Sequence, residues 1–257
     1  MALHVHSPSA AGRDILRALG ALESLSEADR ADVRICDAED AVSGAGGLEI
    51  RLGGGGFEEM LDDCLRIGAA IGKDDAARRL TVDLRNRMFE AAECVNPFED
   101  GPNVAFFTSI DPLRFAGGWI VQLIERAGGR CPWNPTIARP GTGSAAGPQH
   151  GERDAGPGFD MRGSEFVEYP ADVMVFCVEG LDAAACRNQA MGVLNSPRFS
   201  SQPAVRNGRI ACVDGAGTFG RRGPGLVDCF EWLVAWLNRR TMNERVTNGR
   251  TVSWVEI

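Results

Sequence analysis

The residue types best suited to holding a small molecule gather in one turn, residues 216–223. The turn follows the short apolar run 210–213 and leads into an amphipathic helical pattern after Pro224. Within the turn, Phe219 offers a ring that could stack on a flat ligand, and Arg221 offers N–H donors for carboxylate or amide groups. Loops at the ends of parallel strands form the ligand sites of open α/β sheets, so this turn is the first candidate site.

Three residues of the turn, Thr218, Phe219 and Arg221, are the candidate ligand contacts. A second interpretation fits the same residues, since Phe219 could pack beneath the turn and Arg221 could pair with a surface acid. The two interpretations differ in what they require of Phe219, because a ligand contact must be reachable and a packing contact must be buried. The sequence alone leaves both open.

A second pair of candidates, Phe115 and Trp119, stands at the start of a helical pattern over residues 118–127. Both aromatic side chains could line the same site as the turn. The apolar neighbours Ile120 and Leu123 favour a half-buried core position for the Trp119 indole. With the turn, this pair makes five candidate ligand contacts: Phe115, Trp119, Thr218, Phe219 and Arg221.

Residues that could catalyse a reaction or hold a metal are scattered along the chain. The sequence has no Gly-x-Ser-x-Gly motif and no Cys-x-x-Cys pair, and its three histidines, His4, His6 and His150, stand far from every cysteine. We therefore predict no catalytic residue, no metal site and no enzymatic activity. The eight cysteines, several of them inside apolar runs, are expected to be small buried hydrophobic residues of a reducing compartment.

Size and charge narrow the class of protein. The chain has 257 residues, of which 44% are hydrophobic, and its formal net charge is -8. Such a chain can bury a sizeable core, and its scattered basic residues predict no nucleic-acid partner. The sequence has no apolar run of membrane-spanning length, and its first residues lack the pattern of a secretory signal. We therefore expect a cytoplasmic location, with a mature organellar protein as the alternative.

Continuous apolar runs alternate with helical patterns along the chain. The predicted strands span residues 33–36, 48–52, 104–107, 173–178 and 210–213, and the predicted helices include 118–127 and 183–194. Buried strands that alternate with helices indicate an α/β fold with a parallel sheet.

The longest helical pattern covers residues 57–94, with a break expected at 72–74. A run of glycines, residues 53–56, precedes it. No Lys-Ser or Lys-Thr pair follows this run as a phosphate-binding loop would require, so we expect a plain flexible joint. Residues 138–163, rich in Gly, Pro, Ala and Ser, are predicted to form a long loop.

Three segments, in this order, resemble a known family: VAFFTSIDPLRFAGGWIVQLIERAGG (104–129), PADVMVFCVEGLD (170–182) and PAVRNGRIACVDGAGTFGRRGPGLVDCFEWL (203–233). They are similar to the C-terminal lobe of cobalamin-type (class III) substrate-binding proteins of ABC transporters. The resemblance implies an α/β fold of two lobes, in which parallel sheets are flanked by helices and a long helix joins the lobes. It divides the chain into a reduced N-terminal lobe (1–56), an inter-lobe helix (57–95) and a C-terminal α/β lobe (96–257).

The resemblance also implies a function, which is non-enzymatic binding of a small molecule, a corrinoid such as cobalamin, with no covalent cofactor. The five candidate contacts would line the cleft that holds the ligand. Gly220, which stands where docked relatives often carry an acid, and the absent secretory signal favour an intracellular protein over a transporter-docked one. The alternative is a fold that has lost its ligand and serves as a scaffold or subunit of a larger assembly. The short N-terminal lobe, the lack of any aromatic residue before Phe57 and the missing acid favour this alternative.

Overall fold

The computed structural model describes residues 3–26, 31–40, 47–96, 100–138, 153–162, 165–238 and 254–257. The chain forms two compact units. The first comprises Met1–Phe89 and Arg221–Val227, and the second comprises Glu90–Gly220 and Asp228–Ile257. The chain therefore passes between the units three times, and the candidate turn from Arg221 onward belongs to the first unit.

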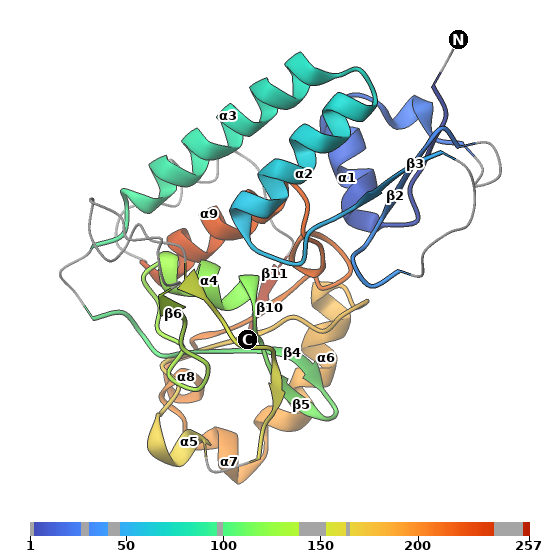
Figure 1. The fold of residues 1–257 in the computed structure, drawn as a ribbon. Coiled ribbons are helices and arrows are strands. Elements are labelled where there is room, and N and C mark those ends of the chain that lie inside the picture. The colour runs from blue at the N-terminus through green and yellow to red at the C-terminus, as the bar shows by residue number, and fades with distance from the viewer. Residues whose placement is uncertain are drawn as a thin grey trace. The chain divides into compact units, whose positions relative to one another are not determined.

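The first unit is built on a parallel sheet with the strand order β1-β2-β3 (Figure 1, blue). The strands are β1 (Val5–His6), β2 (Val33–Cys36) and β3 (Leu48–Arg51), and the helical elements beside them are α1 (Ala10–Ala18) and η1 (Leu22–Ser24). Ser9 caps α1, since its Oγ accepts a hydrogen bond from the N–H of Gly12 at 3.1 Å. The strands predicted over 33–36 and 48–52 are confirmed.

The long helical pattern after the glycine run forms two helices, α2 (Phe57–Ala70) and α3 (Asp74–Ala92). They separate at Gly72, whose φ of 68° lies in the left-handed region that ends many helices. The expected break is thus confirmed. The segment that we predicted to be one inter-lobe helix is a pair of helices, and the boundary between the two units falls inside α3, after Phe89.

The second unit contains a mixed sheet with the order β11-β10-β9-β4-β5-β8 (Figure 1). Its three central strands are parallel: β4 (Val104–Ile110), β9 (Val173–Phe176) and β10 (Ile210–Val213). The antiparallel strands β5 (Leu113–Phe115), β8 (Phe159–Asp160) and β11 (Trp254–Glu256) extend the sheet at its two edges. All three apolar runs predicted as buried strands are confirmed, and so is the α/β fold class.

Helices connect these strands. They are α4 (Trp119–Arg126), α5 (Glu165–Glu168), α6 (Ala183–Leu194), α7 (Pro197–Ser200), α8 (Pro203–Arg206), η3 (Thr218–Gly220) and α9 (Leu226–Leu237). The prediction of a structureless loop over 138–163 is wrong in part, because β8 and a small hairpin of β6 (Ile137–Ala138) and β7 (Arg153–Asp154) occupy its described ends. Residues 139–152 and 163 of that loop lie outside the described residues.

Phe107 of β4 stands at the centre of an aromatic cluster on one face of this sheet. Its side chain is fully buried. Four rings surround it, with centroid distances of 5.0 Å to Phe115, 6.3 Å to Phe166, 5.1 Å to Phe176 and 6.2 Å to Phe199. Aromatic pairs at such distances add to the hydrophobic free energy of burial, so this cluster anchors the strand order β5-β4-β9.

We predict that Phe107→Ala lowers the free energy of unfolding by about 3–5 kcal/mol, because the change leaves a cavity among four rings that cannot all move inward. Urea unfolding followed by tryptophan fluorescence measures the change. Val82→Ala is the matched control, since Val82 lies on α3 with 58% of its surface exposed. The control should stay within about 0.5 kcal/mol of wild type. A loss below about 1 kcal/mol for Phe107→Ala contradicts the prediction.

Candidate functional site

The carboxyl ends of β9 and β10 lead into two loops that pack on each other, residues 177–182 and 214–220. The N–H groups of Gly215 and Ala216 both donate to the carbonyl of Leu181, at 2.9 and 3.1 Å. Asp214 closes the second loop from within, because its Oδ1 accepts from the N–H groups of Ala216 at 3.0 Å and Gly217 at 2.8 Å. We call these two segments the carboxyl-edge loops of the second unit.

Glycine is required at two positions of the carboxyl-edge loops because backbone approaches backbone there. A Cβ atom on Gly215 would lie 2.1 Å from the carbonyl oxygen of Val178, and one on Gly220 would lie 2.0 Å from the carbonyl oxygen of Gly215. Gly220 is the residue at which the resemblance led us to expect an acid in a transporter-docked protein. Its lack of a side chain follows from local packing, since any side chain there would displace the turn.

Phe219 lies under the turn, with 1% of its surface exposed. Its ring centroid is 5.9 Å from that of Phe106 and 5.4 Å from that of Trp232 on α9. The side chain therefore occupies the packing position that the second interpretation requires. Thr218 begins η3 beside it.

Phe115 is also buried, with 3% of its surface exposed, and its ring stacks on Trp133 at 5.2 Å. It packs against Phe107, whereas Phe219 packs against Phe106. Because consecutive residues of a strand point to opposite faces, Phe115 and Phe219 lie on opposite sides of the sheet. The structure therefore does not bring these two candidate rings together.

Trp119 is the candidate aromatic residue that keeps exposed surface. It is half-buried at the first position of α4, directly after Gly118, whose φ of 55° turns the chain into the helix. Contact with a ligand remains a prediction for all five candidates. Among the three aromatic ones, Trp119 has the surface to make such a contact without rearrangement of the core.

Asn134 was missed by the sequence analysis and holds the turn before α4 in place. Its Nδ2 lies 3.1 Å from the carbonyl of Ala116, 3.3 Å from that of Gly156 and 3.2 Å from that of Pro157. The side-chain amide thus ties the segment before Trp119 to the segment before β8. The signal in the sequence is weak, because an asparagine after Pro132 and Trp133 suggests no more than a turn.

The last candidate, Arg221, lies in the first unit. Its Nη1 is 3.4 Å from Oδ2 of Asp14 on α1, so the acid-pairing interpretation describes its surroundings. The next residue, Arg222, donates from Nη1 to the carbonyl of Gly53 at 2.5 Å. Gly53 and Arg222 lie 169 positions apart in the sequence, so no local pattern indicates this contact. Both arginines bind the end of the turn to other elements of the first unit.

The glycine run 53–56 is held by side chains, which corrects the expectation of a plain flexible joint. The N–H of Gly53 donates to Oδ2 of Asp63 at 2.9 Å, while its carbonyl accepts from Arg222. The N–H of Gly55 donates to Oε2 of Glu59 at 2.6 Å, so a side-chain carboxylate already occupies this N–H donor at the start of α2.

Asp63 is a carboxyl group with 5% of its residue surface exposed, on α2. Burial raises the pKa of Asp63 above the usual aspartate value, although the Gly53 N–H and the guanidinium groups of Arg66 and Arg222 act in the opposite direction. Its Oδ1 pairs with Nη1 of Arg66 at 2.8 Å. Desolvation is therefore the dominant influence on this acid.

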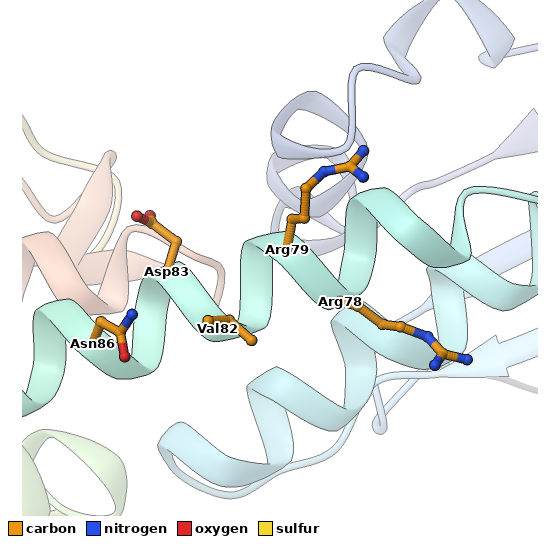
Figure 2. Close-up of a pocket in the computed structure, with 5 residues that line it drawn as sticks. All are labelled: Arg78, Arg79, Val82, Asp83 and Asn86. Carbon is orange, nitrogen blue, oxygen red and sulfur yellow. The ribbon is translucent and has the colours of Figure 1, made fainter.

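Within the described ranges, no group of three or more His, Cys, Asp and Glu side chains could hold a metal ion. His150 lies outside the described residues. A depression of about 410 Å³ runs along α3, and all five side chains that line it project from that one helix (Figure 2). A surface lined by one helix does not enclose a ligand.

Likewise, in the part of the chain that the structure describes, none of the helices has the length and apolarity needed to cross a bilayer.

Comparisons with known proteins identify the fold. Neither a known sequence family nor a curated protein matches the chain. Solved structures do. A periplasmic heme-binding protein from Pseudomonas aeruginosa is 17% identical, with a TM-score of 0.68 and coverage of 94% of both chains. A periplasmic binding protein from Veillonella parvula is 12% identical, with a TM-score of 0.72 and coverage of 92% of this chain and 91% of that one.

A structure from Saccharomonospora viridis, of an ABC-type Fe3+-hydroxamate transport system, is 17% identical, with a TM-score of 0.61 and coverage of 91% of this chain and 92% of that one. At these identities the likeness shows the fold. The predicted two-lobe α/β fold of periplasmic binding proteins is therefore confirmed.

We predict that Gly220→Asp lowers the free energy of unfolding by about 1–3 kcal/mol, because the new Cβ overlaps the Gly215 carbonyl. Gly192→Ala is the matched control. Gly192 lies in α6 with open space around it, so the control should gain about 0.5–1 kcal/mol. Thermal and urea unfolding measure both variants. An unchanged Gly220→Asp protein contradicts the close approach of the two loops.

We predict a pH effect for Asp63→Asn. Since the pKa of Asp63 is raised in the folded state, the unfolded chain loses its proton first as the pH rises through about 3.9. The contribution of Asp63 to stability is therefore highest in acid and falls toward neutral pH. Wild type should lose stability relative to Asp63→Asn between about pH 4 and pH 7.

Urea unfolding of both proteins at about pH 4 and pH 7 measures this difference. Asp62→Asn is the control, because Asp62 is the adjacent aspartate on α2 and its side chain is exposed. A difference between wild type and Asp63→Asn that stays constant or grows toward neutral pH contradicts the assignment.

Proposed function

We propose that this protein is a non-enzymatic binding protein for a tetrapyrrole-type macrocycle, either heme or a corrinoid. The observation that carries the proposal is the two-lobe fold, which matches a heme-binding protein over 94% of both chains. The resemblance of three C-lobe segments to cobalamin-type binding proteins supports the same ligand size from the sequence. Heme and corrinoids share a broad, flat macrocycle that carries a metal, and this shared chemistry is what we propose the protein recognises.

The carboxyl-edge loops of the second unit support a binding role, because ligands of open α/β sheets sit outside the carboxyl ends of the strands. These loops are pre-formed: Asp214 closes one of them, and the Leu181 carbonyl joins it to the other. A site that needs no ordering on binding loses less entropy when the ligand arrives. The half-buried indole of Trp119 would add an aromatic face for the macrocycle.

Charge distinguishes the two macrocycles. Heme carries propionate groups that pair with arginine, whereas the amide groups of a corrinoid need neutral hydrogen-bond partners. The Arg114 side chain on β5 is 46% exposed, and it donates to Oδ1 of Asp160 at 3.1 Å and to the carbonyl of Gly158 at 2.7 Å. Its exposed guanidinium is the group that we propose for an anionic ligand, which would replace these two surface contacts. Heme binding should therefore weaken with salt and with Arg114→Gln, and corrinoid binding should depend on neither.

Titration of the purified chain with hemin, cyanocobalamin and the ferric complex of a hydroxamate tests the proposal. We expect saturable one-to-one binding of one macrocycle with a Kd below about 10 μM, seen as quenched tryptophan fluorescence and a shifted visible absorption band. Saturable binding of the ferric hydroxamate alone overturns the choice of macrocycle. Absence of binding by all three ligands overturns the binding role and favours the scaffold alternative.

We predict that Trp119→Ala weakens macrocycle binding about five- to tenfold, because the aromatic face contributes about 1 kcal/mol beyond its buried area. Phe89→Ala is the matched control, since Phe89 is an aromatic residue with 58% exposure on α3. The same titration measures both variants. If Trp119→Ala binds the macrocycle as tightly as wild type, Trp119 is not part of the site. The binding role itself is tested separately, by the titration of the wild-type protein.

A further inference from the structure

Two buried thiols meet between α6 and β10 in the second unit. Cys186 lies one turn into α6 and Cys212 lies inside β10, and neither has exposed surface. Their side chains are within hydrogen-bonding range of each other. Both belong to the same buried core cluster, on the face of the sheet that also holds Phe107 and Phe176.

Backbone contacts fix where each sulfur lies. The Sγ of Cys186 donates to the carbonyl of Phe176 at 3.4 Å, and Phe176 is the register partner of Cys212 in the parallel pair of β9 and β10. The start of α6 is set by Asp182, whose Oδ1 accepts from the N–H of Ala185 at 2.8 Å. The sheet register and the capped helix thus hold the two thiols side by side.

In the folded unit the two sulfurs differ in acidity. The Cys212 thiol and the Val178 N–H both donate to the Cys186 sulfur, and they lower the pKa of Cys186 against the effect of burial. The same contact and burial raise the pKa of Cys212. The contact between the two thiols thus adds to the backbone contacts that hold the two sulfurs side by side.

We propose that Cys186 and Cys212 are a modification site, at which a disulfide forms and joins α6 to β10. The oxidant is a low-molecular-weight or protein disulfide. The Cys186 thiolate attacks one sulfur of that disulfide, which forms a mixed disulfide and releases one thiolate. Cys212 then loses its proton and attacks the Cys186 sulfur, which releases the second thiolate. The two protons pass to the released thiolates, so two protein thiols are oxidised as one disulfide is reduced to two thiols.

Burial decides when this reaction takes place. Since both sulfurs have no exposed surface in the folded unit, the oxidant reaches them as the chain folds. The new bond closes the segment that carries α7 and α8 and constrains the unfolded chain, which is the main source of disulfide stabilisation. The inference concerns the core of the second unit and does not depend on the ligand proposed above.

Refolding of the reduced, urea-unfolded chain in a buffer with oxidised and reduced glutathione tests the proposal. Remaining thiols are then blocked by alkylation, and the protein is digested with trypsin and a glutamate-specific protease. Cleavage after Glu179 separates Cys177 from Cys186, so mass spectrometry can distinguish the two. We expect a linked pair of peptides that contain Cys186 and Cys212, and two fewer reactive thiols than the eight cysteines of the reduced chain.

The oxidised protein should unfold at a temperature about 5–10 °C higher than the reduced protein. Cys186→Ala and Cys212→Ala should lose the linked peptides and the response to reductant. Cys131→Ala, which removes another buried thiol of the same unit, should keep both. Full alkylation of all cysteines after oxidative refolding, or a link from either thiol to Cys177 or Cys229, overturns the proposal. Because these outcomes are read on the wild-type chain, an unstable variant does not obscure them.

Discussion

The second unit depends on one alternation in β4, where two adjacent phenylalanines point to opposite faces of the sheet. Phe107 packs against Phe115 and Phe176 on one face, and Phe106 packs against Phe219 on the other. Each face is therefore closed by a ring from a segment beside the sheet: Phe115 from the edge strand β5, and Phe219 from η3. The same packing buries Phe115 and Phe219, the two phenylalanine rings that the sequence offered as ligand contacts.

Much of the fold could be predicted because buried strands require apolar residues, which are visible in the sequence. A strand covered on both faces must be apolar throughout, so the runs that became β4, β9 and β10 were recognisable without any neighbour. Gly72 ended a helix at the expected place because its positive φ suits few other residues. The short strands β7 and β8 were missed, because two residues are too few to show an alternation of apolar and polar side chains.

The site was harder to predict because its residues are defined by what covers them. Phe219 could face either a ligand or Phe106, and only the tertiary contact decides between them. The glycine run was misjudged for the same reason, since its restraints come from Asp63 and Glu59, and from Arg222 much later in the chain. Gly220 could be read as a lost acid, whereas the close Gly215 carbonyl leaves no room for any side chain.

The positions of Cys186 and Cys212 in the fold change what the cysteine content indicates about the cellular compartment. Their spacing in the sequence suggested isolated buried thiols and hence a reducing compartment. The sheet register brings Cys212 beside Phe176, and the Phe176 carbonyl brings Cys186 to the same place. Two adjacent thiols can form a disulfide in an oxidising compartment. The cysteine content therefore no longer supports a cytoplasmic location, and that location stays a prediction. The redox state of this one pair would report the environment in which the chain folds, because a disulfide persists where no reductant reaches it.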